Sequence, residues 1–268
     1  MPVRNVLVCT VGGSPEPIVA ALRNGRPDHV VFVCSGKDPA TGRPGSGEQV
    51  LGTGNIIKAR PDDAKPTLPN IPAQVGLLQG QFEVLPVSAD DLDAAFAAIH
   101  TALQGMRSRF PDAHVIADYT GGTKTMSSAL VTAALESGVE LQLVTGSRVD
   151  LVKVRDGTQQ VALAEVEGVR LKRAMAPFVA AWERYAYDEA AAGLACIVAP
   201  RSNQLRARLN RARDLSAAFA AWDRFDHAEA ARRLSGYAPV VAGELGAHLG
   251  ELLRTHRRPE KGAVAPLG

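Results

Sequence analysis

A glycine-rich segment, Asp118-Tyr-Thr-Gly-Gly-Thr-Lys-Thr-Met126, separates a strand-like run at 113–117 from a helix-like run at 127–136. A loop in this place opens a helix, so the unbonded backbone amides of the first helical turn face the loop. Two glycines, three threonine hydroxyls and a lysine add groups that bind anions. The segment therefore predicts a phosphate-binding site.

A second loop of the same construction follows the first apolar run of the chain. It reads Thr10-Val-Gly-Gly-Ser-Pro-Glu-Pro17. We expect a helix over 14–24, with Ser14 as N-cap, Pro15 at the first helical position and Gly25 at its end. Because both loops follow neighbouring strands of the expected sheet, they predict one shared site.

The first half of the chain alternates strand and helix patterns. Apolar runs that read as strands occur at 3–10, 30–34, 82–87, 115–118 and 139–145, and helical spacing occurs at 14–24, 90–109 and 123–137. Strands that are apolar throughout and separated by helices predict a parallel sheet covered on both faces. We therefore expect an α/β fold with a Rossmann-like, mostly parallel sheet and helices on both faces.

Two stretches of this half interrupt the alternation. Residues 36–80 hold eight glycines and six prolines without periodicity, which is typical of a functional flap or of disorder. Residues 149–154 and 161–166 flank Arg155-Asp-Gly-Thr158. The Asp-Gly pair predicts the turn of a closing β-hairpin.

The second half is helical and contains a repeat. Residues 180–194 match 220–234 at eight of fifteen positions, a period of 40 that is typical of stacked helical units. Trp182 and Trp222 occupy equivalent places on apolar stripes, so we expect both in a core. In all we expect a Rossmann-like ligand-binding domain over 1–168, a small all-α repeat-containing domain over 169–256, and a tail or truncated linker over 257–268.

Composition narrows the class of protein. The chain has no run of about 18 apolar residues and no leader-like N-terminus, so we expect a cytoplasmic protein without a membrane span. Cys9, Cys34 and Cys196 lack metal-type spacing, and we expect reduced thiols and no metal site. Residues 1–169 carry 14 basic and 18 acidic side chains, whereas 170–268 carry 16 and 10. The basic second half is either a solvated helical face or a surface for nucleic acid or an acidic partner.

Neither glycine loop fits the two common nucleotide signatures. The dinucleotide fingerprint Gly-x-Gly-x-x-Gly is missing after the first strand, and the mononucleotide loop Gly-x-x-x-x-Gly-Lys-Ser/Thr is broken because Thr123 separates Gly122 from Lys124. We expect neither a nicotinamide cofactor nor ATP hydrolysis, and we assign no cofactor. What remains is an anion site made of backbone amides, hydroxyls and one lysine.

Together the two loops resemble the CRISPR-associated Rossmann fold (CARF) family, which occurs in ancillary proteins of type III CRISPR systems. The resemblance covers roughly residues 3–165, and the motif at 118–126 is the more specific of the two. It implies a homodimeric sensor of cyclic oligoadenylate, a cyclic RNA messenger, with the tetra-adenylate as the first choice of ligand.

Matching positions give the ligand-binding residues that the resemblance implies. One wall of the pocket would consist of Thr10, Gly12, Gly13 and Ser14, and the phosphate floor of Thr120, Gly121, Gly122, Thr123 and Lys124. Ser35, Gly36 and Lys37 would complete the pocket, and Met126 either packs on the apolar face of its helix or contacts adenine. Some members of the family cleave their messenger slowly without a metal, and the candidate groups for such catalysis here are Lys124, Thr10 and Ser14.

No output activity is evident from the sequence. A HEPN-type ribonuclease needs Arg-x4–6-His, and in the helical half of the chain no histidine follows an arginine at that spacing. We therefore expect the signal to pass to an effector that is not evident in this chain, or the helical part to act by binding. The alternative function is a nucleic-acid-binding regulator that uses the basic helical half, where the arginines cluster at Arg201, Arg206, Arg208, Arg211 and Arg213.

Overall fold

The computed structural model describes residues 3–38, 41–52, 68–146, 148–149, 153–154 and 159–237. The chain divides after Glu165 into two compact units, here called the N-terminal unit and the helical unit. Three expected features lie outside the described residues: the hairpin turn at 155–158, the tail at 257–268 and much of the glycine- and proline-rich stretch.

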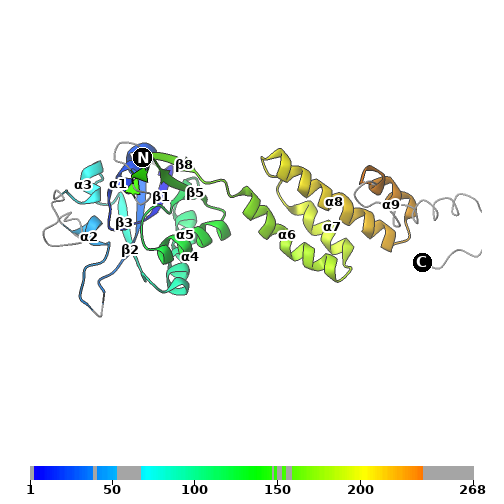
Figure 1. Ribbon diagram of the computed structural model, residues 1–268, viewed down its shortest axis with the longest axis horizontal. Coiled ribbons are helices and arrows are strands. Elements are labelled where there is room, and N and C mark those ends of the chain that lie inside the picture. The colour runs from blue at the N-terminus through cyan, green and yellow to red at the C-terminus, as the bar shows by residue number, and fades with distance from the viewer. Residues whose placement is uncertain are drawn as a thin grey trace, which may run out of the picture. The chain divides into compact units, whose positions relative to one another are not determined.

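The N-terminal unit is built on a six-stranded sheet with the order β3-β2-β1-β4-β5-β8 (Figure 1). Every neighbouring pair is parallel except β5 and β8. The strands are β1 (Asn5–Thr10), β2 (His29–Ser35), β3 (Phe82–Val87), β4 (His114–Asp118), β5 (Glu140–Thr145) and β8 (Gln160–Leu163). This architecture confirms the expected Rossmann-like, mostly parallel sheet.

Helices connect the parallel strands. They are α1 (Glu16–Gly25), α2 (Glu48–Leu51), α3 (Ile71–Val75), α4 (Leu92–Arg109) and α5 (Lys124–Glu136). The connection from β1 to β2 runs in one direction across the sheet and that from β4 to β5 in the other. Since such crossovers are right-handed, α1 and α5 lie on opposite faces of the sheet. On these faces α1 contacts α3, and α4 contacts α5.

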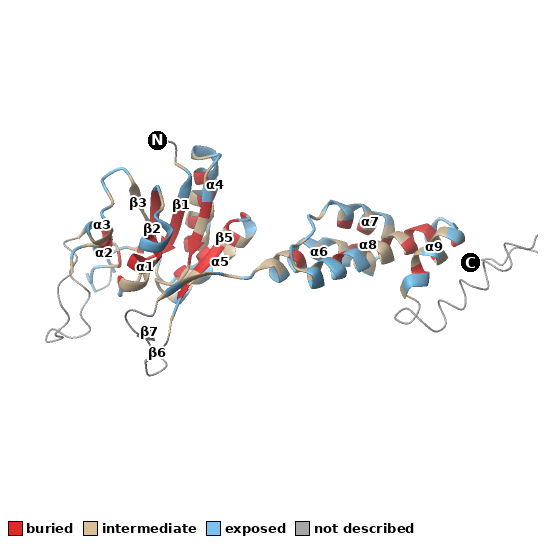
Figure 2. Ribbon diagram, turned by 90° about the horizontal axis from the view of Figure 1, so that it is seen from above, coloured by how far each residue is buried: buried red, intermediate tan, exposed pale blue. Residues whose placement is uncertain are grey.

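The central strands carry the core of this unit. β1 and β2 are buried along almost their whole length (Figure 2). On one side the core continues into Ile18 and Leu22 of α1, and on the other into Leu130 and Ala133 of α5. The sheet is therefore covered on both faces.

The start and end of α1 differ from expectation. The helix begins at Glu16, and Pro15 takes the cap position with a helical backbone (φ −76°, ψ −24°) and no side-chain cap. The prediction that Ser14 caps this helix was wrong. At the other end Arg26, not Gly25, adopts the left-handed conformation, with φ 41°.

The expected closing hairpin was also wrong. β6 (Arg148–Val149) pairs with β7 (Lys153–Val154), while β8 pairs antiparallel with β5 at the edge of the main sheet. The physical reason is the open edge of β5, whose backbone groups β8 satisfies.

The repeat of the helical unit is a repeat of helix pairs. Its elements are α6 (Glu167–Glu183), α7 (Tyr187–Cys196), α8 (Asn203–Asp223), α9 (His227–Leu234) and the 3-10 turn η1 (Ser235–Tyr237). The turns after α6 and α8 are alike: Tyr185 (φ 64°) and Phe225 (φ 61°) both take the left-handed conformation. The 40-residue period therefore describes two similar helical hairpins.

Both tryptophans are half-buried, and Trp222 packs against the core of this unit. The indole nitrogen of Trp182 donates to the Ser216 hydroxyl at 2.6 Å, and its ring meets Phe219 edge-on at 5.0 Å. The Trp222 ring stacks on that of Phe219, with the ring centres 6.0 Å apart. Packing between helices therefore accounts for both positions.

Candidate anion-binding site

The two glycine loops follow β1 and β4, which are neighbours at the centre of the sheet. At this point the strand order changes direction, because β2 and β3 extend the sheet to one side and β5 to the other. In open parallel sheets ligands bind in the crevice at the carboxyl ends of the strands on either side of such a point. The fold therefore places both loops where ligands bind.

The two loops touch through their backbones. A Cβ atom built on Gly12 would lie 2.8 Å from the backbone nitrogen of Gly122, and one built on Gly121 would lie 2.4 Å from the carbonyl oxygen of Thr10. Only glycine permits this approach. Gly122 also has a φ of 83°, which favours glycine. Three of the four glycines are thus required for the loops to form one surface.

Threonine hydroxyls hold this arrangement. The Thr10 hydroxyl donates to the Gly121 carbonyl at 2.7 Å. The Thr120 hydroxyl accepts from the Val144 amide at 2.7 Å.

The third hydroxyl, of Thr123, links the loop to the segment after β3 and caps α5. It donates to the Ala89 carbonyl at 2.6 Å and accepts from the Met126 amide at 3.2 Å. All three hydroxyls of Thr10, Thr120 and Thr123 therefore serve the loop's own structure.

The groups that remain for a ligand lie on the outside of the loops. Gly13, Ser14 and Lys124 are exposed. Lys124 is the first residue of α5. The amides of the first helical turn have no carbonyl partner within a helix, and Thr123 caps only that of Met126. The amides of Lys124 and Thr125 and the Lys124 ammonium group together make a positive surface.

Two predicted contact residues are buried. Thr10 and Met126 are each 0% exposed. Met126 lies in the core beneath α5, which fits the packing alternative and removes it from the ligand surface. The Thr10 hydroxyl is bonded to the Gly121 carbonyl, so Thr10 supports the loop and does not reach the ligand surface.

The sequence interpretation missed a buried polar pair at the end of β4. Asp118 accepts a hydrogen bond from the Thr120 amide at 2.9 Å and another from the side-chain amide of Gln142 at 3.0 Å. Burial raises the pKa of the Asp118 carboxyl, and these hydrogen bonds partly offset the rise. An aspartate two residues before a loop amide is the signal that could have revealed this turn.

A third loop, after β2, reaches the same region. The Ser35 amide donates to the Ser46 hydroxyl at 2.9 Å, which folds the loop back on the strand end. The buried side chain of Gln49 then donates to the Gly13 carbonyl at 3.5 Å. Gly36 and Lys37 are exposed on this loop, and within the described chain no hydrogen bond joins them to either glycine loop.

The cysteines, possible metal ligands and helix hydrophobicity were also considered in the sequence. Cys9 and Cys34 are free and buried, and burial raises the pKa of the Cys34 thiol to about 12. Across the described ranges, no group of three or more His, Cys, Asp or Glu side chains is arranged to hold a metal ion. In the same ranges no helix combines the length and the apolar character that crossing a membrane requires.

Comparison with known proteins gives structural likeness only. No protein-family model and no curated protein matches the sequence. Among solved structures, Csm6 of Enterococcus italicus bound to cyclic hexa-2'-fluoro-hexa-dAMP has a TM-score of 0.53 and 15% identity, over 94% of this chain. This chain spans 65% of that Csm6 chain.

A weaker match is Can2 of Sulfobacillus thermosulfidooxidans, solved in complex with cyclic tetra-adenylate. Its TM-score is 0.37 and its identity 13%, over 95% of this chain and 68% of that one. The likeness to Csm6 shows a shared fold, and at that level it confirms the CARF resemblance found in the sequence.

Proposed function

We propose that the N-terminal unit is a sensor that binds cyclic oligoadenylate across a homodimer axis and passes the signal to an effector not evident in this chain. The observation that carries the proposal is the contact between Gly12 and Gly122 at the centre of the sheet. It joins two glycine loops into one anion-binding surface at the place where such folds bind ligands. Csm6 of Enterococcus italicus, which shares the fold, was solved with a ligand of the same chemical class, cyclic hexa-2'-fluoro-hexa-dAMP.

Lys124 supplies the second argument. A cation in the first turn of a helix opposes the helix dipole, so the fold alone gives little reason for a lysine there. A bound phosphate reverses the sign of this interaction, because it accepts from the free amides and from the lysine at once. The position of Lys124 is therefore explained by an anionic ligand.

The ring symmetry of the ligand suits a dimer. A cyclic tetra-adenylate has a two-fold axis, and a homodimer related by two-fold symmetry would present the same loops to each half of the ring. We take the tetra-adenylate as the first ligand to test. Each chain would then contact half of the phosphates.

The contacts of the site residues support different roles for them in the proposed site. We assign direct contact to Gly13, Ser14, Lys124 and the backbone at Gly122. These groups are positioned by side chains that are buried or bonded within the loops, namely those of Thr10, Thr120, Thr123 and Asp118. Gly12 and Gly121 allow the loops to meet, and Ser35, Gly36 and Lys37 form a rim on the third loop.

Slow cleavage of the ring would have few groups to draw on. The Thr10 hydroxyl is buried and donates to a carbonyl, so only Lys124 and Ser14 of the three candidates face outward. Neither glycine loop contains a histidine to act as base. We propose that any cleavage is slow and depends on placing a ribose hydroxyl in line with its phosphate.

Titration calorimetry with cyclic tri-, tetra- and hexa-adenylate tests the proposal. We expect one ring to bind per two chains, with the tetra-adenylate tightest. Tighter binding of the hexa-adenylate would make the larger ring the ligand and would leave the proposed binding site unchanged. Absence of heat with all three rings, or one ring per chain, would contradict the proposal.

A further inference from the structure

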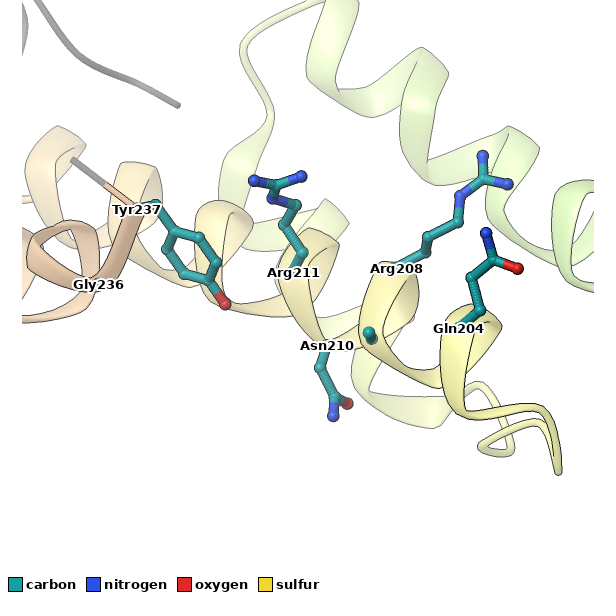
Figure 3. Close-up of a pocket in the computed structure, with 7 residues that line it drawn as sticks. Gln204, Arg208, Asn210, Arg211, Gly236 and Tyr237 are labelled. Atoms are coloured by element: carbon teal, nitrogen blue, oxygen red, sulfur yellow. The ribbon is translucent and has the colours of Figure 1, made fainter. Parts of the chain in front are cut away.

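A groove lies on the helical unit between α8 and η1. Its volume is about 620 Å³, and it is lined by Gln204, Ala207, Arg208, Asn210, Arg211, Gly236 and Tyr237 (Figure 3). In Figure 3 the side chain of Arg208 lies beside Gln204, and that of Arg211 lies beside the Tyr237 ring. The groove therefore combines two cations, two side-chain amides and an aromatic ring.

The helix period brings these side chains together. Gln204, Arg208 and Arg211 are spaced by four and three residues, so they lie on one face of α8. No acidic residue occurs in α8 before Asp214. That carboxylate is occupied, because it accepts from the Tyr237 hydroxyl at 2.7 Å and lies 3.8 Å from the Arg233 guanidinium. The groove face of α8 is consequently positive.

The arginines of this region divide into two kinds. Arg206 donates to the Pro200 carbonyl at 3.2 Å, and Arg213 donates to the Leu194 carbonyl at 2.9 Å. These two side chains hold the loop between α7 and α8 in place. Arg208 and Arg211 are exposed and have no carboxylate partner within the described residues. The Arg208 and Arg211 guanidinium groups are therefore available to a ligand.

Tyr237 is held as a flat, fixed surface. Its hydroxyl is anchored on Asp214, and the Arg211 guanidinium lies 5.7 Å from the centre of its ring. An aromatic ring beside an arginine is the arrangement on which nucleobases stack, and the adjacent cations meet the phosphates. An acidic peptide would use the two arginines but would leave the ring without a role.

We propose that this groove binds single-stranded nucleic acid, with a base stacked on Tyr237 and phosphates on Arg208 and Arg211. The Gln204 amide is placed to hydrogen-bond to a base or ribose. A single strand fits better than a duplex, because paired bases are stacked on one another and do not offer a free face to the ring. This site is independent of the ligand proposed for the N-terminal unit.

Fluorescence anisotropy of a labelled 12-nucleotide single-stranded RNA with the full chain tests the groove. We expect Arg208→Ala/Arg211→Ala to weaken binding at least tenfold at 50 mM salt. It should also reduce the slope of log K against log salt by about 1.4, as for two lost phosphate contacts on a single strand. The matched control, Lys172→Ala/Arg173→Ala, removes the same charge from exposed positions on α6 and should change affinity less than twofold.

Tyrosine variants separate stacking from charge. Tyr237→Leu should weaken RNA binding about fivefold or more. Tyr237→Phe should bind RNA nearly as tightly as the wild type, since the ring is kept and only the hydrogen bond to Asp214 is lost. Circular dichroism identifies any variant that has unfolded, and calorimetry with cyclic tetra-adenylate should give the wild-type affinity for the groove variants.

Three results would overturn the proposal: no RNA binding by the wild type, equal losses in the groove and control double variants, or a 12-residue polyglutamate that binds as tightly as RNA. The last would assign the groove to an acidic protein.

Discussion

The two units of this chain prepare their surfaces in opposite ways. In the N-terminal unit three threonine side chains of the loops are turned inward, where the hydroxyls of Thr10, Thr120 and Thr123 bond to the protein itself. The surface left for a ligand is mostly backbone. In the helical unit backbone groups are satisfied within helices, and long side chains such as Arg208 and Arg211 form the surface. Ligand binding by the glycine loops should therefore be weakened most by substitutions that add a side chain to a glycine. Binding by the helical unit should be weakened most by substitutions that shorten an arginine.

The largest effect is expected from breaking the helical unit alone. Trp182→Ala removes a half-buried ring that contacts Ser216 and Phe219, and should lower the free energy of unfolding by about 3 kcal/mol, the lower end of the range for large aromatic residues. The remaining tryptophan, Trp222, reports this transition by fluorescence in urea. Affinity for cyclic tetra-adenylate should not change.

Val198→Ala is the matched control, because Val198 is 88% exposed. A loss of ligand affinity in Trp182→Ala at unchanged stability would make the tryptophan a contact residue. The core assignment would then be wrong.

The next effect tests the backbone contact of the loops. Gly121→Ala places a Cβ 2.4 Å from the Thr10 carbonyl oxygen, and a rigid backbone cannot yield easily. We expect a loss of about 2–3 kcal/mol in unfolding free energy, as for overpacking, together with weakened ligand binding. Gly13→Ala is the control for stability, since nothing lies within 4 Å of its added Cβ. Equal melting temperatures for the two variants would show that the loops do not need their close approach.

The strands of the N-terminal unit and the two glycine loops could be predicted from the sequence. Apolar runs predicted the five parallel strands of the main sheet because buried parallel strands have no other pattern, and the run at 161–166 predicted β8 but with the wrong partner. The glycine pairs marked both loops because only glycine allows the approach of Gly12 to Gly122. What a pattern of single residues does not reveal is a partner far along the chain. The bonds from Thr10 to Gly121 and from Gln142 to Asp118 cross 111 and 24 residues, so these side chains were assigned to ligand or missed.

Lys124→Ala should weaken binding of cyclic tetra-adenylate by about 2 kcal/mol, roughly thirty-fold, as for a hydrogen bond to a charged group. Thermal stability should stay the same or rise slightly, because the lysine opposes the helix dipole. Calorimetry and a melting curve measure the two quantities, and Lys172→Ala on α6 is the control. Normal binding by Lys124→Ala would remove the phosphate floor from the proposed site.

The smallest effect distinguishes the two loops from each other. Thr123 caps α5, whereas Ser14 makes no cap bond at α1. Thr123→Ala should therefore cost about 1 kcal/mol of stability, and Ser14→Ala should cost almost none. If Ser14→Ala lowered the melting temperature as much as Thr123→Ala, the cap originally expected at Ser14 would be correct after all.

The central claim is that two glycine loops form one binding surface, and amide NMR of the isotope-labelled full chain tests it most directly. On titration with cyclic tetra-adenylate, the amide signals of Gly13, Gly122 and Lys124 should shift together with one apparent affinity, while those of α7 and α8 stay in place. Shifts confined to one loop, or to the helical unit, would contradict a shared site.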